Sequence, residues 1–218
     1  MELAHPDLNN KLDSYQKITY SDIYTFLKNI DFEQEEFPVS EFNYMYYALL
    51  TEVIANQQNE DYFSLLEKNI IEPLKLTHTQ YLDDFKAEEL SPVFDKTDET
   101  ERLRFDALKE STELQSSLED MISFTRQQLL FAENSLQKGM TLTRDLSSFD
   151  ERDQAVGLAW QSEMTEGMVY YYIQGNTPGS SAFVTIIPDI KSALIVLSNT
   201  PLDTQNFSKT ILNQMIQE

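Results

Sequence analysis

Two short segments place a lysine three residues after a serine, at Ser14–Lys17 and at Ser135–Lys138. On a helix, residues three apart share a face, so the lysine amine can take the proton of the serine hydroxyl and create a nucleophile. Ser14 lies in a polar stretch that predicts a loop, and Ser135 lies in a stretch, 133–154, that predicts short turns or one further helical turn over 136–142. Of the two pairs, Ser14 with Lys17 is the preferred candidate.

Other common catalytic chemistries lack the residues that they require. The chain has no cysteine, which excludes disulfides, thiolate metal sites and cysteine nucleophiles. Its two histidines, His5 and His78, are too few for a histidine-based zinc site. No glycine-rich phosphate loop, dinucleotide fingerprint, His-Glu-x-x-His or EF-hand loop occurs. We therefore expect no metal and no cofactor.

The net charge narrows the classes of partner. The chain carries a formal charge of −21, and its acidic residues are spread along the sequence rather than gathered in a tail. Such a charge repels nucleic acid phosphates and anionic lipids, so neither is an expected partner. No apolar run reaches the length of a membrane span, and the first residues, MELAHPDLNNK, lack the basic and apolar regions of a signal peptide.

The elements that must position any site are a helical first part and a strand-rich last part. Residues 172–200 predict strand, glycine turn, strand, tight turn and strand, with a further strand over 156–163. Gly175 and Gly179 are expected to bracket the first of these turns. Apolar spacing predicts helices over 20–29, 42–56, 60–74, 116–132 and 204–216, with a long excursion of short ordered pieces over 83–112.

These patterns predict an α+β fold, with an antiparallel sheet flanked by a helical lobe. We expect a single domain over residues 1–218, with residues 18–150 mainly in the helical lobe and residues 155–218 forming the sheet strands and the last helix. The helix over 42–56 is apolar almost all round, which is typical of a buried helix.

Six segments, in this order, resemble the serine β-lactamase-like family, which includes class C β-lactamases, penicillin-binding D-alanyl-D-alanine carboxypeptidases and related esterases. Three of the five glycines fall at glycine positions of that family. The segments are ITYSDI at 18–23, YALL at 47–50, YFSLLEKNIIEPLKLTHT at 62–79, SSLEDMISF at 116–124, VGLAW at 156–160, and GNTPGSS at 175–181 followed by IPD and VLSN.

The resemblance implies a β-lactamase/transpeptidase-like fold with the active site between the sheet and the helical lobe. It places the Ser-x-x-Lys of the family several tens of residues upstream of Ile18, so the N-terminal strands and the nucleophile helix of the family have no counterpart in this chain. It also implies a bacterial cell-envelope, extracytoplasmic location.

The second family motif, Tyr-x-Asn, falls on Phe42-Asn43-Tyr44 by this resemblance. Phenylalanine keeps the ring of the family tyrosine and deletes its only proton-transferring atom. In a shifted register Tyr44 would supply the phenol, and we keep it as a candidate ligand-binding residue.

The third family motif, Lys/His-Thr/Ser-Gly on a sheet strand, falls on Ile173-Gln174-Gly175. Isoleucine can neither donate a proton nor bind a carboxylate, whereas Gln174 can still form hydrogen bonds and Gly175 can still let a ligand approach the backbone. Gln174, Gly175, Asn176 and Thr177 are therefore candidate ligand-binding residues.

Two functions follow from these motifs. The first is a non-catalytic β-lactamase-like domain, a pseudoenzyme that binds a cell-wall-type peptide or a protein partner. The second is part of a serine hydrolase, namely a β-lactamase, carboxypeptidase or esterase, whose nucleophile lies outside this chain. Without the N-terminal strands of the family, the terminal strand of the sheet is expected to have an open edge that a second copy or another protein covers.

Overall fold

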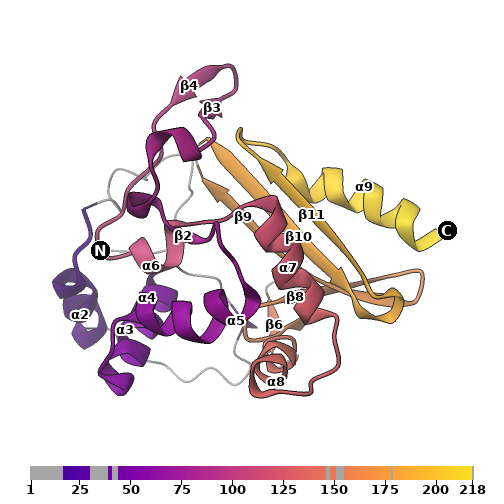
Figure 1. The fold of residues 1–218 in the computed structure, drawn as a ribbon, viewed down its shortest axis with the longest axis horizontal. Helices are drawn as coiled ribbons and strands as arrows, with labels where there is room; N and C mark the ends of the chain where they lie inside the picture. Colours follow the sequence, from indigo (N-terminus) through magenta and orange to yellow (C-terminus); the bar gives the residue numbers. More distant parts are fainter. Residues whose placement is uncertain are drawn as a thin grey trace. The chain divides into compact units, whose positions relative to one another are not determined.

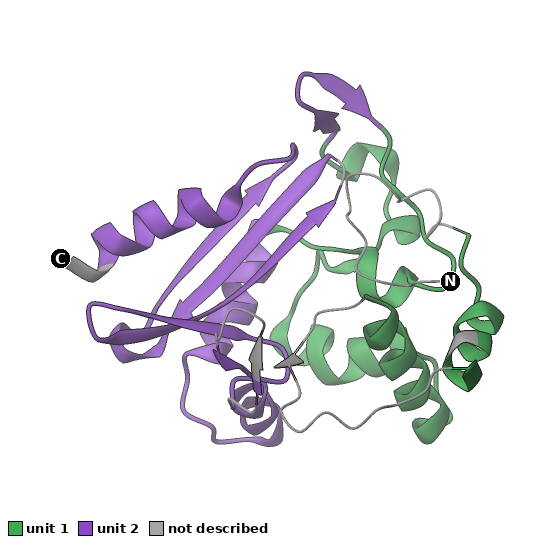
Figure 2. Ribbon diagram, turned by 180° about the vertical axis from the view of Figure 1, so that it is seen from behind, with its two compact units in different colours: residues 1–35, 42–91, 101–117 green, residues 36–41, 92–100, 118–218 purple. Residues whose placement is uncertain are grey.

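The computed structural model describes residues 17–29, 39–40, 44–145, 148–150, 155–177 and 179–217. The chain divides into two compact units, coloured separately in Figure 2. Unit 1 comprises residues 1–35, 42–91 and 101–117, and unit 2 comprises residues 36–41, 92–100 and 118–218. Ser14, Phe42 and Asn43, which the sequence singled out, lie outside the described residues.

Unit 1 is built on helices α2 (Tyr20–Asn29) and α3 (Tyr44–Gln58), and on one helical stretch formed by α4 (Tyr62–Leu66), the π-helical turn η1 (Glu67–Ile71) and α5 (Glu72–Leu74). Its core joins α2 and α3 to the segment before α6, through Ile18, Ile23, Met45, Ala48, Phe105, Ala107 and Leu108. The helices predicted over 20–29 and 60–74 are confirmed.

Helices α2 and α4 of unit 1 begin at side chains that accept hydrogen bonds from backbone N–H groups of their first turn. The Asp22 carboxylate accepts from the Thr19 backbone N–H at 2.9 Å, and the Thr19 hydroxyl accepts from the Asp22 backbone N–H at 3.3 Å. Asp61 caps α4 by accepting from the Ser64 backbone N–H at 2.9 Å. These contacts explain why the sequence signals located the helix starts.

The remaining pieces of unit 1 are short, as predicted for most of the excursion over 83–112. They pack around the β2–β5 pair and bring residues 80–81 beside residues 114–115. In chain order they are β2 (Gln80–Tyr81), η2 (Leu82–Asp84), η3 (Ala87–Glu89), α6 (Lys109–Thr112) and β5 (Leu114–Gln115).

Unit 2 contains a seven-stranded sheet in the order β1-β6-β7-β8-β9-β10-β11. All neighbouring pairs are antiparallel except β1–β6. The first three strands in the sheet are short: β1 (Val39–Ser40), β6 (Ser148–Asp150) and β7 (Ala155–Val156). The others are longer: β8 (Gln161–Thr165), β9 (Met168–Thr177), β10 (Ser180–Ile187) and β11 (Ser192–Ser198). The turn η4 (Pro188–Ile190) precedes β11.

Helices cover both faces of this sheet (Figure 1). On one face, α9 (Thr204–Gln217) packs through Leu212 on Tyr170, Tyr172 and Phe183. On the other face, α7 (Leu118–Gln128) packs its Met121 and Phe124 beside Trp160, Val184 and Ile186. Helix α8 (Ser135–Leu142) follows α7. The α+β class with an antiparallel sheet and the terminal helix are therefore confirmed.

Two expectations about individual elements are wrong. Helix α3 is not buried all round, because Tyr46, Leu50, Val53 and Ile54 are exposed and only one face meets the core. The strand expected over 156–163 is two strands, β7 and β8, since the chain turns at Gly157, where a Cβ would lie 2.7 Å from the Thr143 carbonyl oxygen. Residues 118–142 form α7 and α8, which lie in the sheet unit and not with the helices of residues 18–117.

No helix in the described part of the chain is long and apolar enough to cross a membrane.

Candidate functional site

Strand β9 carries the candidate residues 173–177. This second half of the strand is paired differently from its first half. Residues 161–165 of β8 pair with residues 168–172 of β9, and the pairing stops at Tyr172. From Ile173 to Thr177, β9 is paired along its length only with β10. Within the described residues, no strand pairs with the other edge of this segment. Alternate residues of the segment therefore direct a backbone N–H and C=O away from β10.

Successive side chains of a strand point to opposite faces, so the candidate residues divide into two sets. Gln174 pairs with Phe183, which belongs to the core under α9, so Gln174 and Asn176 lie on the α9 face. Ile173 pairs with Val184, which belongs to the core under α7, so Ile173, Gly175 and Thr177 lie on the α7 face. A ligand on either face meets the side chains of only one set.

Gly175 does not bound a turn, as the sequence had suggested, because it lies within β9 opposite Ala182. An added Cβ at Gly175 would meet nothing within 4 Å, and its φ is not positive. The fold therefore does not require glycine here. Open space above an exposed strand backbone allows another molecule to approach closely.

The turn itself is at Gly179, which connects the paired residues Thr177 and Ser180. Gly179 has a φ of +87°, and a Cβ there would lie 2.9 Å from the Val93 Cβ. Both the left-handed backbone and the close contact require glycine at this position. Across the turn, the Thr177 and Ser180 hydroxyls are 2.6 Å apart.

The turn at Gly179 packs against a hairpin of β3 (Val93–Asp95) and β4 (Asp98–Thr100), drawn at the top of Figure 1. Asn199, just after β11, forms hydrogen bonds to the hairpin segment through both its side-chain amide and its backbone carbonyl. Its amide donates to the Pro92 carbonyl at 2.9 Å, and its own carbonyl accepts from the Phe94 backbone N–H at 2.9 Å. The hairpin thus fixes the end of the sheet at which residues 173–177 lie.

Ile173 carries no group that can transfer a proton, and 40% of its side-chain surface is exposed. An exposed isoleucine offers apolar contact only. The chemistry left on this part of β9 is hydrogen bonding, by the backbone edge and by the Gln174, Asn176 and Thr177 side chains.

Tyr44, the remaining candidate with a phenol, begins α3 in unit 1. Its ring packs against the core of that unit, and burial raises the pKa of its hydroxyl above the ordinary value. A general base must be deprotonated near neutral pH before it can accept a proton. The raised pKa therefore disfavours Tyr44 as a proton acceptor. The Ser111 hydroxyl donates to the Tyr44 carbonyl at 3.2 Å and ties the start of α3 to α6.

The serine–lysine pairs gain no support as nucleophile sites. Ser14 lies outside the described residues, and its partner Lys17 is exposed. Ser135 and Lys138 lie on one helix, α8, which begins at the Asn134–Gln137 capping box and agrees with the helical turn that the sequence allowed over 136–142. Both side chains are exposed, so no neighbouring group shields them from water.

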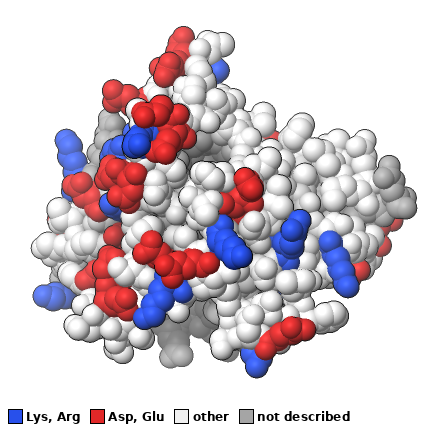
Figure 3. Space-filling model, in the orientation of Figure 1, with Lys and Arg blue, Asp and Glu red and all other residues white. Residues whose placement is uncertain are grey.

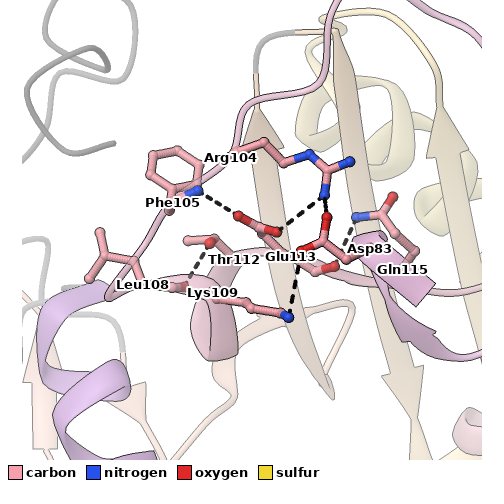
Figure 4. Close-up of polar contacts among 8 residues, drawn as sticks. All are labelled: Asp83, Arg104, Phe105, Leu108, Lys109, Thr112, Glu113 and Gln115. Carbon is pink, nitrogen blue, oxygen red and sulfur yellow. Dashed lines mark hydrogen bonds and ion pairs between the residues drawn. The ribbon is translucent and has the colours of Figure 1, made fainter. Parts of the chain in front are cut away.

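Unit 1 also contains a polar network that the sequence analysis missed, drawn in Figure 4. The Glu113 carboxylate, only 4% exposed, accepts a hydrogen bond from the buried Phe105 backbone N–H and lies 3.9 Å from the Arg104 guanidinium. Arg104 also pairs with Asp83, and the Lys109 amine lies 3.7 Å from Asp83. Burial raises the pKa of Glu113 above its usual range, with Phe105 and Arg104 opposing that shift.

This network has a structural role that its contacts explain. It connects η2 to the chain before α6 and to α6 itself, with Asp83 and Arg104 separated by 21 positions in the sequence. The sequence signal was a dense mixture of both charges over residues 83–113, which does not say which residues pair. Among the described residues, no group of three histidine, aspartate or glutamate side chains could hold a metal ion.

Comparisons with known proteins agree with this architecture. The β-lactamase family model matches residues 27–215. The class C β-lactamase of Rhodobacter sphaeroides superimposes with a TM-score of 0.76 at 16% identity, over 95% of this chain and 72% of that chain. A search among curated proteins finds no match to the sequence.

Two further solved structures are similar over a smaller share of their length. The β-lactamase/D-alanine carboxypeptidase of Pseudomonas syringae gives a TM-score of 0.73 at 16% identity, over 84% of this chain and 61% of that chain. Another class C β-lactamase gives 0.71 at 15% identity, over 86% and 60%. This chain therefore spans less than two thirds of the length of these two proteins.

Proposed function

Because the chain belongs to the β-lactamase family, we propose that it is a non-catalytic member that binds a cell-wall-type peptide along β9. The proposal rests on an exposed Ile173 together with a backbone edge of β9 that no other described strand pairs with, at one place on the sheet. The edge can bind an extended peptide, and the isoleucine cannot catalyse a reaction on it.

An extended peptide that lies beside residues 173–177 adds a strand to the sheet. Its backbone groups pair with the N–H and C=O groups that β9 directs away from β10, and this pairing does not depend on the peptide side chains. Specificity then comes from the side chains of β9 on each face. Ile173 supplies apolar contact, Thr177 supplies a hydroxyl on the same face, and Gln174 supplies an amide on the opposite face.

The alternative is a serine hydrolase whose nucleophile lies outside this chain. Two observations count against it. Residues inside the chain are also changed from the family motifs, namely Phe42 and Ile173. Tyr44, which a shifted register would recruit, has a raised pKa and is disfavoured as a base at neutral pH.

A titration with a synthetic peptide tests the proposed binding. The probe is a stem peptide that ends in D-alanyl-D-alanine, added to isotope-labelled protein while backbone amide NMR signals are recorded. We expect saturable shifts at residues 173–177 and unchanged peptide in the recovered sample. Shifts confined to other residues, or the release of D-alanine, would overturn the proposal.

Gly175→Val provides the matched variant for this titration. A Cβ at this position meets nothing within 4 Å and valine favours strands, so the fold should be kept, while the added methyl groups occupy the space through which a ligand reaches β9. We expect at least a tenfold weaker interaction with the peptide. Equal affinity in the variant would place the peptide elsewhere.

A further inference from the structure

Strand β11 ends the seven-stranded sheet, and no other strand in the described part of the chain pairs with its outer edge. In the described part of the chain it pairs only with β10, in register from Ser192 opposite Ile187 to Ser198 opposite Ser181. Helix α7 lies against one face of β11 and α9 against the other. Its faces are therefore covered, while the backbone groups on its outer edge are available to pair with another strand.

This edge lacks the features by which sheet proteins prevent association. Edge strands usually carry a charged side chain, a proline or a bulge. The seven residues of β11, SALIVLS, contain no charge and no proline, and every residue pairs regularly with β10. A long, regular and uncharged edge strand favours pairing with another strand.

The sequence of β11 is complementary to itself. If two copies pair antiparallel about Ile195, then Ile195 faces Ile195, Leu194 faces Val196, and Ser192 faces Ser198. Residues directly opposite each other in an antiparallel pair lie on the same face, so the apolar residues continue the two cores already present. A twofold axis generates this arrangement from identical surfaces.

The segment that contains β11 also has a lower net negative charge than the chain as a whole. The whole chain carries −21, whereas residues 180–217 contain two acidic residues, Asp189 and Asp203, and two basic residues, Lys191 and Lys209, which gives zero. The surface over α9 is almost free of charged side chains in Figure 3. Repulsion between two copies is therefore weakest here.

Exposed apolar side chains lie at both ends of β11. At its start are Ile190 and Phe131, whose ring lies 5.7 Å from the Lys191 amine and which is 81% exposed. At its end are Leu197 and Leu202, each also exposed. An antiparallel pair places the start of one β11 beside the end of the other, so the same arrangement brings these residues together.

We propose that two copies of this chain associate through β11, antiparallel and centred on Ile195, to form one continuous sheet. The occupant of the edge is a second copy because the edge is self-complementary in sequence, neutral in an acidic chain, and flanked by apolar residues that the twofold pairing covers. The proposed peptide site on β9 is separated from this edge by β10 and does not depend on it.

Introduced cysteines test the register, because the natural chain contains none. In the proposed dimer the two Ile195 Cβ atoms are about 5 Å apart, within reach of a disulfide. The two copies of Ser192 are separated by about 20 Å. We therefore expect Ile195→Cys to form a disulfide-linked dimer on mild oxidation, and Ser192→Cys to remain unlinked. Ser192→Cys combined with Ser198→Cys should link again.

The mass in solution tests the association without a cross-link. We expect sedimentation of the full chain to show a species of twice 25.3 kDa that increases with concentration. Leu197→Lys adds a charge at the edge and should shift the population to monomer at least tenfold, whereas Leu158→Lys, on an exposed loop residue of the same unit, should not. A monomer at all concentrations, or equal cross-linking of Ile195→Cys and Ser192→Cys, would overturn the proposal.

Discussion

Gly175 and Gly179, on either side of Thr177, differ in what the fold demands of them. Gly175→Ala should leave the free energy of unfolding unchanged or raise it by about 0.5–1 kcal/mol, because alanine lowers the entropy of the unfolded chain and has space in β9. Gly179→Ala should lower it by more than 1 kcal/mol, since φ is +87° and Val93 lies too close. Urea unfolding of both variants measures the difference. Equal effects would contradict the assigned roles.

Glu113 is expected to stabilise unit 1 by accepting a hydrogen bond from a buried donor. Glu113→Ala leaves the Phe105 N–H without its acceptor and should cost about 1–3 kcal/mol. Glu113→Gln keeps an acceptor oxygen and should cost less. Chemical denaturation near pH 7 ranks the two, and an alanine variant as stable as the glutamine variant would contradict this role.

Because the pKa of Glu113 is raised, the difference in stability between the wild type and Glu113→Gln should depend on pH. The folded state holds this proton more tightly than the unfolded state, so the contribution of Glu113 grows as pH falls through the folded pKa and is complete below the ordinary value of 4.5. Relative to Glu113→Gln, the wild type should therefore gain stability between neutral pH and pH 4.5. Unfolding curves over this range test the sign, and a difference that shrinks on acidification would be the wrong sign.

The stretch α4–η1–α5 depends on one cap at its start. Asp61→Ala should destabilise unit 1 by about 1 kcal/mol, and Asp61→Asn by only a few tenths, because asparagine also caps helices. The Ser64 backbone N–H lowers the pKa of Asp61, so its contribution is present above the ordinary value of 3.8 and is lost as pH falls through the folded pKa. Thermal unfolding at pH 7 and pH 3 should show a smaller alanine difference at the lower pH.

Periodic apolar spacing predicted the elements that pack one face on a core. It located α2 and α9 to within a residue or two, and the strand–turn pattern of residues 172–200 located β9, β10 and β11. It failed for α3, because Leu50 and Val53 are apolar yet exposed, and spacing alone does not say which apolar residues meet a core. It also missed the turn at Gly157, which depends on a close contact with Thr143 from another segment.

The candidate site was predictable in position and not in geometry. The segment 173–177 was identified from its residues, but the opposite faces of Ile173 and Gln174 follow from the register with β10. The free edge of the segment follows from the start of β8 at Gln161, since Gln161 pairs with Tyr172 and no residue of β8 pairs with β9 beyond it. Pairings between strands are long-range contacts, which local sequence patterns do not specify.

The charge of the whole molecule should make its stability depend on salt. A net charge of −21 on 218 residues favours expanded states through repulsion, and salt screens that repulsion. We expect the melting temperature to rise as sodium chloride increases from low to physiological concentration. Differential scanning calorimetry measures this, with a neutral osmolyte as control, and a melting temperature that falls with salt would contradict the expectation.

The central claim is that this chain uses a β-lactamase fold to bind and not to acylate. The most direct measurement is the intact mass of the protein, purified from cells that express its native gene, after exposure to a penicillin and separately to a fluorophosphonate. We predict an unchanged mass in both cases, because neither Ile173 nor Tyr44 provides the proton transfer that acylation needs. A stoichiometric increase by the mass of either reagent would contradict the claim and identify a serine hydrolase.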